Sequence, residues 1–120
     1  DLEVTGDLRA DLGAAVRSSL ARHPEEHRAA LLPVMEAVAR VVATRRPGFR
    51  VPTFALDAEG APALSGPDAE VFVQLWRSDI ALDAAATMVT KAWSATKGGA
   101  IDETGLSALV RRVDRLLTNT

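Results

Sequence analysis

Apolar side chains recur every four residues near the start of the chain, which is the spacing of one face of an α-helix. The stripe consists of Leu8, Leu12, Val16 and Leu20. It predicts a helix from Asp7 to Arg22, with Asp7 as the N-cap because its carboxylate can accept hydrogen bonds from the free amides of the first turn. Gly13 lies inside this helix and is expected to weaken it slightly.

A second apolar arc predicts a helix over residues 24–46, which a Pro-Gly pair then ends. The arc consists of Leu31, Val34, Met35, Val38, Val41 and Val42. Glu36 and Arg40 lie four residues apart on the opposite side, where they can pair. Pro33 lacks the amide of the helical ladder, so we expect either a kink or two helical pieces that meet near Leu32.

Residues 49–64 change character and predict a small antiparallel β-hairpin. Aromatic and β-branched side chains favour an extended first strand. A turn is expected over residues 57–60, in which Gly60 supplies a positive φ, and residues 61–64 form the returning strand. Pro52 and Pro62 cannot donate hydrogen bonds to a ladder, so both strands should be short and edge-like.

The rest of the chain predicts three more helices. The first opens at residues 65–68, and its buried stripe consists of Val71, Phe72, Leu75 and Trp76. The stripe changes phase after Arg77, so a separate helix is expected with Ser78 as its N-cap and its end at Lys97. The last helix is predicted over residues 104–117. Its stripe consists of Leu106, Leu109, Val110, Val113, Leu116 and Leu117.

These elements together predict an α+β fold that is mainly α. About five helices surround one core, with the hairpin of residues 49–64 inserted between the second and third helices. A chain of 120 residues, 48% hydrophobic and 25% charged, is long enough for one compact domain over residues 1–120 and short for two. Position 1 is Asp rather than Met, so the sequence is equally compatible with a fragment of a longer chain.

Composition narrows the classes of function. Cys is absent, which excludes disulfides and Cys-based metal sites and is compatible with a reducing compartment, so we expect a cytoplasmic protein. The net charge of −2 is too close to neutral to predict a polyanionic partner. No run of about 18 apolar residues could span a bilayer, so no membrane partner is expected. Arg outnumbers Lys twelve to two, which is typical of a bacterial protein from a GC-rich genome.

The segment HPEEH at residues 23–27 raises the question of a metal site. Zinc-protease helices need both histidines inside one helix, with the general base directly after the first. Pro24 occupies that place here, and it fits the first position of a helix. The two acids that follow suit the positive end of the helix dipole. Since His23 and His27 are the only histidines, a helix start is favoured over a metal site.

Other catalytic patterns are weak. Asp79 and Asp83 lie four apart and could do acid–base work or bind a hard cation, but acids also favour the start of a helix. The serines lack the G-x-S-x-G elbow, and there is no glycine-rich phosphate loop. We therefore name no catalytic residue, metal ligand or cofactor. A metal-dependent enzyme that uses His23, His27 or the two aspartates remains a less favoured hypothesis.

Two clusters of opposite charge flank the start of the hairpin. The basic cluster consists of Arg40, Arg45, Arg46 and Arg50, and the acidic cluster consists of Asp57, Glu59, Asp68 and Glu70. Phosphate binding would need such basic clusters, preferably with aromatics or a reading helix. Only Phe49 and Phe54 lie near, so a nucleic-acid partner is not expected. Solvated helix ends, or pairing of the two clusters with each other, explain the charges better.

Trp76 and Trp93 are the only tryptophans, and each lies on an apolar helical face, where core packing is the ordinary interpretation. They could instead line an apolar pocket together with Met35 and Met88, or anchor a partner. The residues that we name as possible ligand or partner contacts are Trp76, Trp93, Arg45, Arg46, Arg50 and Phe54.

The sequence favours a non-enzymatic protein–protein interaction module, such as an adaptor, a regulatory subunit or an assembly subunit. It would bind a protein partner, or a second copy of itself as a homodimer, through an exposed amphipathic helical face or the hairpin edge. The last helix could close the chain's own core or pack on a partner helix, and closure is favoured. The alternative function is a small-molecule sensor with a Trp- and Met-lined pocket.

Overall fold

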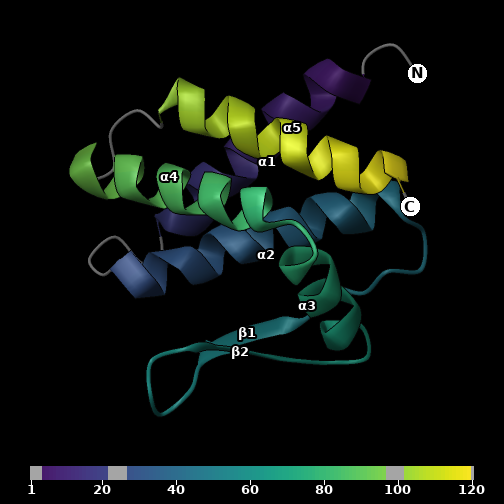
Figure 1. Ribbon diagram of the computed structural model, residues 1–120, viewed down its shortest axis with the longest axis vertical. Coiled ribbons are helices and arrows are strands. Elements are labelled where there is room, and N and C mark those ends of the chain that lie inside the picture. The colour runs from purple at the N-terminus through teal and green to yellow at the C-terminus, as the bar shows by residue number, and fades with distance from the viewer. Residues whose placement is uncertain (1–3, 22–26, 97–101, 120) are drawn as a thin grey trace.

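The computed structural model describes residues 4–21, 27–96 and 102–119. Within these ranges the chain forms five helices and one hairpin (Figure 1). The elements are α1 (Val4–Leu20), α2 (His27–Arg45), β1 (Thr53–Leu56), β2 (Pro62–Ser65), α3 (Ala69–Arg77), α4 (Ile80–Thr96) and α5 (Glu103–Asn119). The predicted fold class, a mainly helical α+β fold with a hairpin between the second and third helices, is confirmed.

Four helices form the body of the molecule. α1 and α4 each pack against both α2 and α5, and α3 and the hairpin lie at one end of this body (Figure 1). The stripe predicted for the last helix faces inward, because Leu106, Leu109, Val110 and Val113 are all at most 7% exposed. α5 therefore closes the core of its own chain.

α1 begins at Val4, so the prediction that Asp7 is its N-cap is wrong. Val4 continues the four-residue spacing of the apolar stripe, and the helix extends back to include it. The four predicted stripe residues are fully buried. The predicted end at Arg22 lies outside the described residues.

α2 is one helix with Pro33 inside it, so the alternative of two pieces meeting near Leu32 is wrong. Pro33 is buried, and the burial of the apolar arc on both sides of it outweighs the one backbone hydrogen bond that its ring removes. The predicted pair is present, with Arg40 Nη2 donating to Glu36 Oε2 at 2.8 Å. The predicted start at Pro24 lies outside the described residues.

Two buried glycines allow the helices to approach α5 closely. A Cβ added to Gly13 of α1 would lie 3.3 Å from Leu106 Cδ2, and one added to Gly105 of α5 would lie 3.4 Å from the backbone nitrogen of Val89. The contact at Gly13 would be tighter than most real Cβ contacts, whereas the one at Gly105 is at the lower limit of ordinary van der Waals contact. Gly13, expected only to weaken its helix, is thus the point where α1 meets α5.

β1 and β2 pair antiparallel, with Phe54 opposite Leu64 and Leu56 opposite Pro62. β1 begins at Thr53, four residues after the predicted start of the hairpin at residue 49, and β2 ends at Ser65, one residue after its predicted end. Aromatic rings hold it against α3: the ring of Phe54 meets the ring of Phe72 edge-on, with 5.7 Å between centroids. Phe72 is almost fully buried, so the hairpin packs on the same core as the helices.

Asp57 organises the hairpin turn. Its amide donates to the Ala61 carbonyl at 2.8 Å, and its Oδ1 accepts from the amides of Glu59 and Ala61, both at 2.9 Å. Gly60 has φ +82°, as predicted, because a turn of this kind needs one left-handed residue before the second strand.

The buried face of α3 differs from the prediction. Ala69, Phe72 and Trp76 are buried and Val73 is half-buried, a spacing of three and four residues that defines one helical face. Val71 lies off this face and is 43% exposed, so its predicted burial is wrong.

The break between α3 and α4 falls where it was expected, but Ser78 is not the N-cap of α4. Ser78 is the C-cap of α3, and its hydroxyl donates to the Leu75 carbonyl at 3.0 Å. Asp79 caps α4 instead, because its Oδ1 accepts from the Leu82 amide at 3.1 Å. The helix then runs to Thr96, and the predicted end at Lys97 lies outside the described residues.

Candidate functional site

An apolar groove of about 320 Å³ lies beside β2, and we call it the β2 groove. Four elements contribute to it, and β1 does not. Its lining residues are Leu31 and Met35 of α2, Pro62 and Leu64 of β2, Val73, Trp76 and Arg77 of α3, and Asp83 of α4. The groove therefore runs along the side of β2 that faces away from β1.

A second hollow of about 360 Å³ continues the β2 groove toward the hairpin turn, and we call it the turn hollow. It is lined by Leu31, Glu59, Gly60, Ala61 and Pro62. Since Leu31 and Pro62 border both hollows, they form one depression from the turn of the hairpin to the start of α4.

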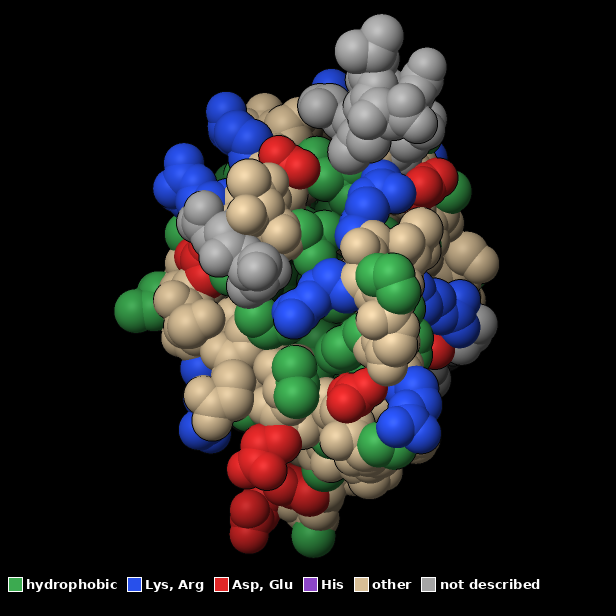
Figure 2. All heavy atoms as spheres, turned by 90° about the vertical axis from the view of Figure 1, so that its right-hand side faces the viewer, with side chains coloured by type: hydrophobic (Ala, Val, Ile, Leu, Met, Phe, Trp, Pro, Cys, Tyr) green, Lys and Arg blue, Asp and Glu red, His purple; other side chains and the backbone are tan. Residues whose placement is uncertain are grey.

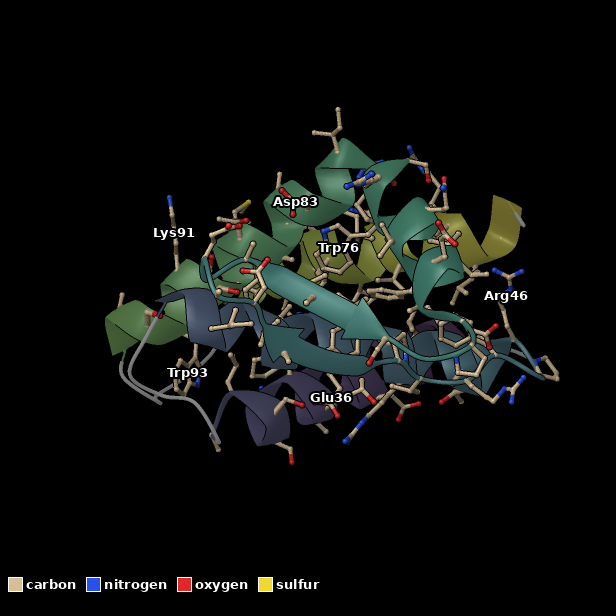
Figure 3. All side chains as sticks on the ribbon, turned by 90° about the horizontal axis from the view of Figure 1, so that it is seen from below. Glu36, Arg46, Trp76, Asp83, Lys91 and Trp93 are labelled. Atoms are coloured by element: carbon tan, nitrogen blue, oxygen red, sulfur yellow. The ribbon has the colours of Figure 1, made fainter. Side chains whose placement is uncertain are left out.

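Trp76 is one of the residues that line the β2 groove, and its ring is held in place. The side chains of Trp76 and Met35 are 7% and 6% exposed. Trp76 Nε1 donates to Asp83 Oδ1 at 2.9 Å, a bond between α3 and α4 that fixes the orientation of the indole. Figure 3 shows Trp76 and Asp83 together on the α4 side of the hairpin.

The side of β2 next to the groove offers backbone hydrogen-bonding groups. Asp57 and Ala61 are hydrogen-bonded across the hairpin, and such pairs alternate with pairs whose amides and carbonyls point outward. Pro62 and Leu64 fall in the outward-pointing pairs. The ring of Pro62 therefore removes no bond from the ladder, and the N–H and C=O of Leu64 point out of the sheet, with no partner among the described residues.

Charged side chains stand at the rim of the depression. Arg77 of α3 and Asp83 of α4 both line the β2 groove, so its wall on this side carries one positive and one negative side chain. Glu59 stands at the turn end. Neither Arg77 nor Glu59 forms an ion pair within the described parts of the chain.

The structure does not bring the six candidate contact residues together. Trp76 lies in the β2 groove, whereas Phe54 is half-buried beneath the hairpin against Phe72. Trp93 is 4% exposed and lies at the opposite end of the molecule from Arg46 (Figure 3). The two tryptophans therefore do not share a pocket, and Met88, 42% exposed, does not line the groove.

The candidate arginines lie near the end of α2. Arg46 is half-buried and borders, with Trp76, a closed apolar cavity of about 10 Å³, which is far too small for an organic ligand. Arg45 Nη2 lies 4.0 Å from Asp11 Oδ2, and its buried Nε and Nη2 form no hydrogen bond within the described ranges. Arg50 is exposed, and its backbone amide donates to Asp68 Oδ2 at 2.7 Å.

The two charge clusters are not joined by a side-chain ion pair among the described residues. The backbone bond from Arg50 to Asp68 links them instead. Figure 2 shows Lys and Arg side chains scattered over one face, separated by apolar and acidic groups rather than gathered into one patch. This arrangement gives no support to a nucleic-acid interface.

The structure gives the two aspartates structural contacts: Asp79 caps α4 and Asp83 holds Trp76. No group of three or more His, Asp or Glu side chains is placed to hold a metal within the described residues. The side chains of the HPEEH segment, residues 23–27, lie outside that description. None of the described helices is long and apolar enough to cross a membrane.

Val73 and Arg77 were not predicted as groove residues from the sequence, and neither was the hydrogen bond between Trp76 and Asp83. Val73 lies outside the predicted stripe, and Asp83 belongs to the next helix, so periodicity carried no signal for either. The outward groups of Leu64 could have been inferred from the position of Pro62, since a ladder tolerates proline only where the amide points away. Comparison of the chain with family models, with curated proteins and with solved structures gave no match.

Proposed function

We propose that this chain is a non-enzymatic protein-binding module whose binding site is the β2 groove. The observation that carries the proposal is the combination of an unpaired strand edge with an apolar depression beside it. The outward N–H and C=O of Leu64 can bond a partner's backbone, while Met35, Val73 and Trp76 offer apolar surface to its side chains.

The faces of the helices are weaker candidates for the binding site than the β2 groove. The stripe of α5 is already buried in the chain's own core. Among the described residues, the exposed large apolar side chains are Val51, Leu56, Val71, Ile80 and Met88, and they are spread over the hairpin region and two helices. Isolated exposed apolar residues are normal on a soluble protein and do not mark an interface.

A matched pair of variants tests the proposal. Val73→Glu places a carboxylate in the β2 groove, whereas Val71→Glu places one on the exposed side of the same helix. Each variant and the wild-type chain serve as bait for proteins of the source cell, after circular dichroism has shown that both variants are folded. We expect the wild type and Val71→Glu to retain the same partner and Val73→Glu to lose it.

Self-association is tested with the same three proteins by light scattering after size-exclusion chromatography at several concentrations. If the partner is a second copy, the mass of the wild type and of Val71→Glu rises with concentration and that of Val73→Glu does not. A monomer at every concentration, together with identical sets of retained proteins for all three baits, would contradict the proposal.

A small apolar ligand is the alternative occupant, favoured by the groove volume of about 320 Å³ and by Met35 and Trp76 in its lining. Trp93→Phe leaves Trp76 as the single tryptophan. Titration of that variant with a panel of metabolites should then shift the Trp76 emission if a ligand enters the groove. A protein partner retained by the bait and no shift with any metabolite would favour the module over the sensor.

A further inference from the structure

We propose that the β2 groove takes an extended peptide, which adds to β2 as a third strand and carries a basic side chain to Glu59 at the turn hollow. This inference rests on the proposed function and names the chemistry of its partner. Three features of the site support it: the outward-pointing backbone groups of β2, the position of the apolar surface beside β2, and the negative charge at the hairpin turn.

The alternation of outward-pointing backbone groups along β2 favours an extended partner over a helical one. The outward groups of β2 are the N–H and C=O of Leu64 and the C=O of Pro62, since the Pro62 ring has no N–H to offer. An extended residue opposite Leu64 can exchange two hydrogen bonds with it, and a residue two positions away can donate to the Pro62 carbonyl. A helical partner uses its own backbone groups internally and would leave these three unpaired.

The apolar surface lies where one face of such a strand would point. Leu31, Met35 and Trp76 line the depression beside β2, and side chains of an added strand alternate between that depression and solvent. The peptide should therefore carry aliphatic residues at every second position. Only three backbone groups and one shallow depression are available, so we expect dissociation constants in the micromolar range.

The charge at the turn gives the peptide its second feature. Asp57 and Glu59 are exposed at the tip of the hairpin, and Asp57 Oδ1 accepts hydrogen bonds from two amides of the turn. Glu59 lines the turn hollow without an ion pair among the described residues. Acidic side chains also gather at the hairpin end of the face seen in Figure 2. A Lys or Arg of the peptide would meet this charge, whereas the other wall carries one charge of each sign, Arg77 and Asp83.

A library of random peptides displayed on phage, selected on the immobilised chain, tests the inference. We expect enriched peptides with aliphatic residues at alternate positions and a Lys or Arg next to them. Synthetic versions are then measured by fluorescence polarisation. Glu59→Gln should weaken binding about two- to fivefold, as expected for one partly exposed ion pair. The control Glu70→Gln, which removes an exposed acid of α3 outside both hollows, should leave binding unchanged.

N-methylation of the peptide backbone, one residue at a time, tests strand addition without changing the protein. Methyl groups on the two amides that face β2 should weaken binding about tenfold or more, while those on the intervening amides should have little effect. Absence of enriched peptides, enriched peptides that become helical on binding, or an N-methyl scan without alternation would overturn this inference.

The same peptides separate this inference from the proposed function. If they bind without alternation or charge dependence but Val73→Glu abolishes binding and Val71→Glu does not, the groove is the binding site and the extended peptide is wrong. If neither variant changes binding, both proposals fail.

Discussion

Ser19 carries a buried hydroxyl without a partner in the described part of the chain, which makes it a test of how a single polar atom affects stability. Its side chain is fully buried and its Oγ makes no hydrogen bond within the described residues, so we expect it to carry a desolvation penalty that no interaction offsets. We expect Ser19→Ala to raise the free energy of unfolding by about 1 kcal/mol more than Ser18→Ala, an exposed neighbour in the same helix.

Urea denaturation followed by circular dichroism measures both serine variants. The control removes the general gain in helix propensity that any Ser→Ala change brings. Equal changes for Ser18→Ala and Ser19→Ala would mean that the Ser19 hydroxyl is satisfied in solution.

Single residues also show what the sequence could and could not predict. Core packing, the ordinary interpretation of Trp76 and Trp93, agrees with their exposed fractions of 7% and 4%, because apolar periodicity reports burial directly. The partner of Trp76 could not be predicted, since Asp83 lies seven residues away across a helix break. The separation of the two tryptophans likewise depends on how α3 and α4 turn at that break.

At the scale of elements, the assignment of Asp79 as the N-cap of α4 gives a second prediction. Asp79→Ala removes the acceptor of the Leu82 amide and should lower the free energy of unfolding by about 1 kcal/mol. Ser78→Ala should have a smaller effect, because Ser78 lies outside α4 and bonds a carbonyl of the preceding helix. Thermal unfolding of the two variants compares them, and a larger loss for Ser78→Ala would restore Ser78 as the cap.

Most elements could be predicted from sequence because each has a strong local cause. The hairpin follows from a turn built by Asp57 and Gly60, and α5 follows from a narrow apolar stripe. Predictions failed where two neighbouring residues could serve equally, as Ser78 and Asp79 could at the α4 cap. They also failed where the helical face depended on a tertiary contact, as in the exposure of Val71.

The close approach of α1 to α5 gives a third prediction. Gly13→Val places methyl groups against Leu106, where even a Cβ would lie 3.3 Å from Cδ2, and should lower the free energy of unfolding by about 1–3 kcal/mol through overpacking. Ala14→Val is the control, because Ala14 is exposed in the same helix. This change should lower the free energy of unfolding only through the poorer helix propensity of valine. Chemical denaturation measures both, and an equal loss in the two variants would mean that α1 and α5 are farther apart.

At the scale of the whole molecule, the candidate site could not be read from the chain. The β2 groove joins residues of α2, β2, α3 and α4, whose relative positions follow from tertiary contacts such as those of α4 with α2 and of α3 with β2 rather than from any local pattern. The sequence did indicate one component, the open strand edge, through the prolines at its ends. An edge and a depression become a candidate binding site only when the fold places them side by side.

The burial of α5 decides whether the chain is stable as one copy, and it gives the last prediction. Leu109 is fully buried in the core shared by the helices, so Leu109→Ala should lower the free energy of unfolding by about 2–5 kcal/mol. Because the α5 stripe packs within its own chain, the thermal midpoint of Val73→Glu, the variant that should not associate through the β2 groove, should not change over a hundredfold range of protein concentration. If α5 instead packed on a partner helix, unfolding would be coupled to dissociation and the midpoint would rise with concentration.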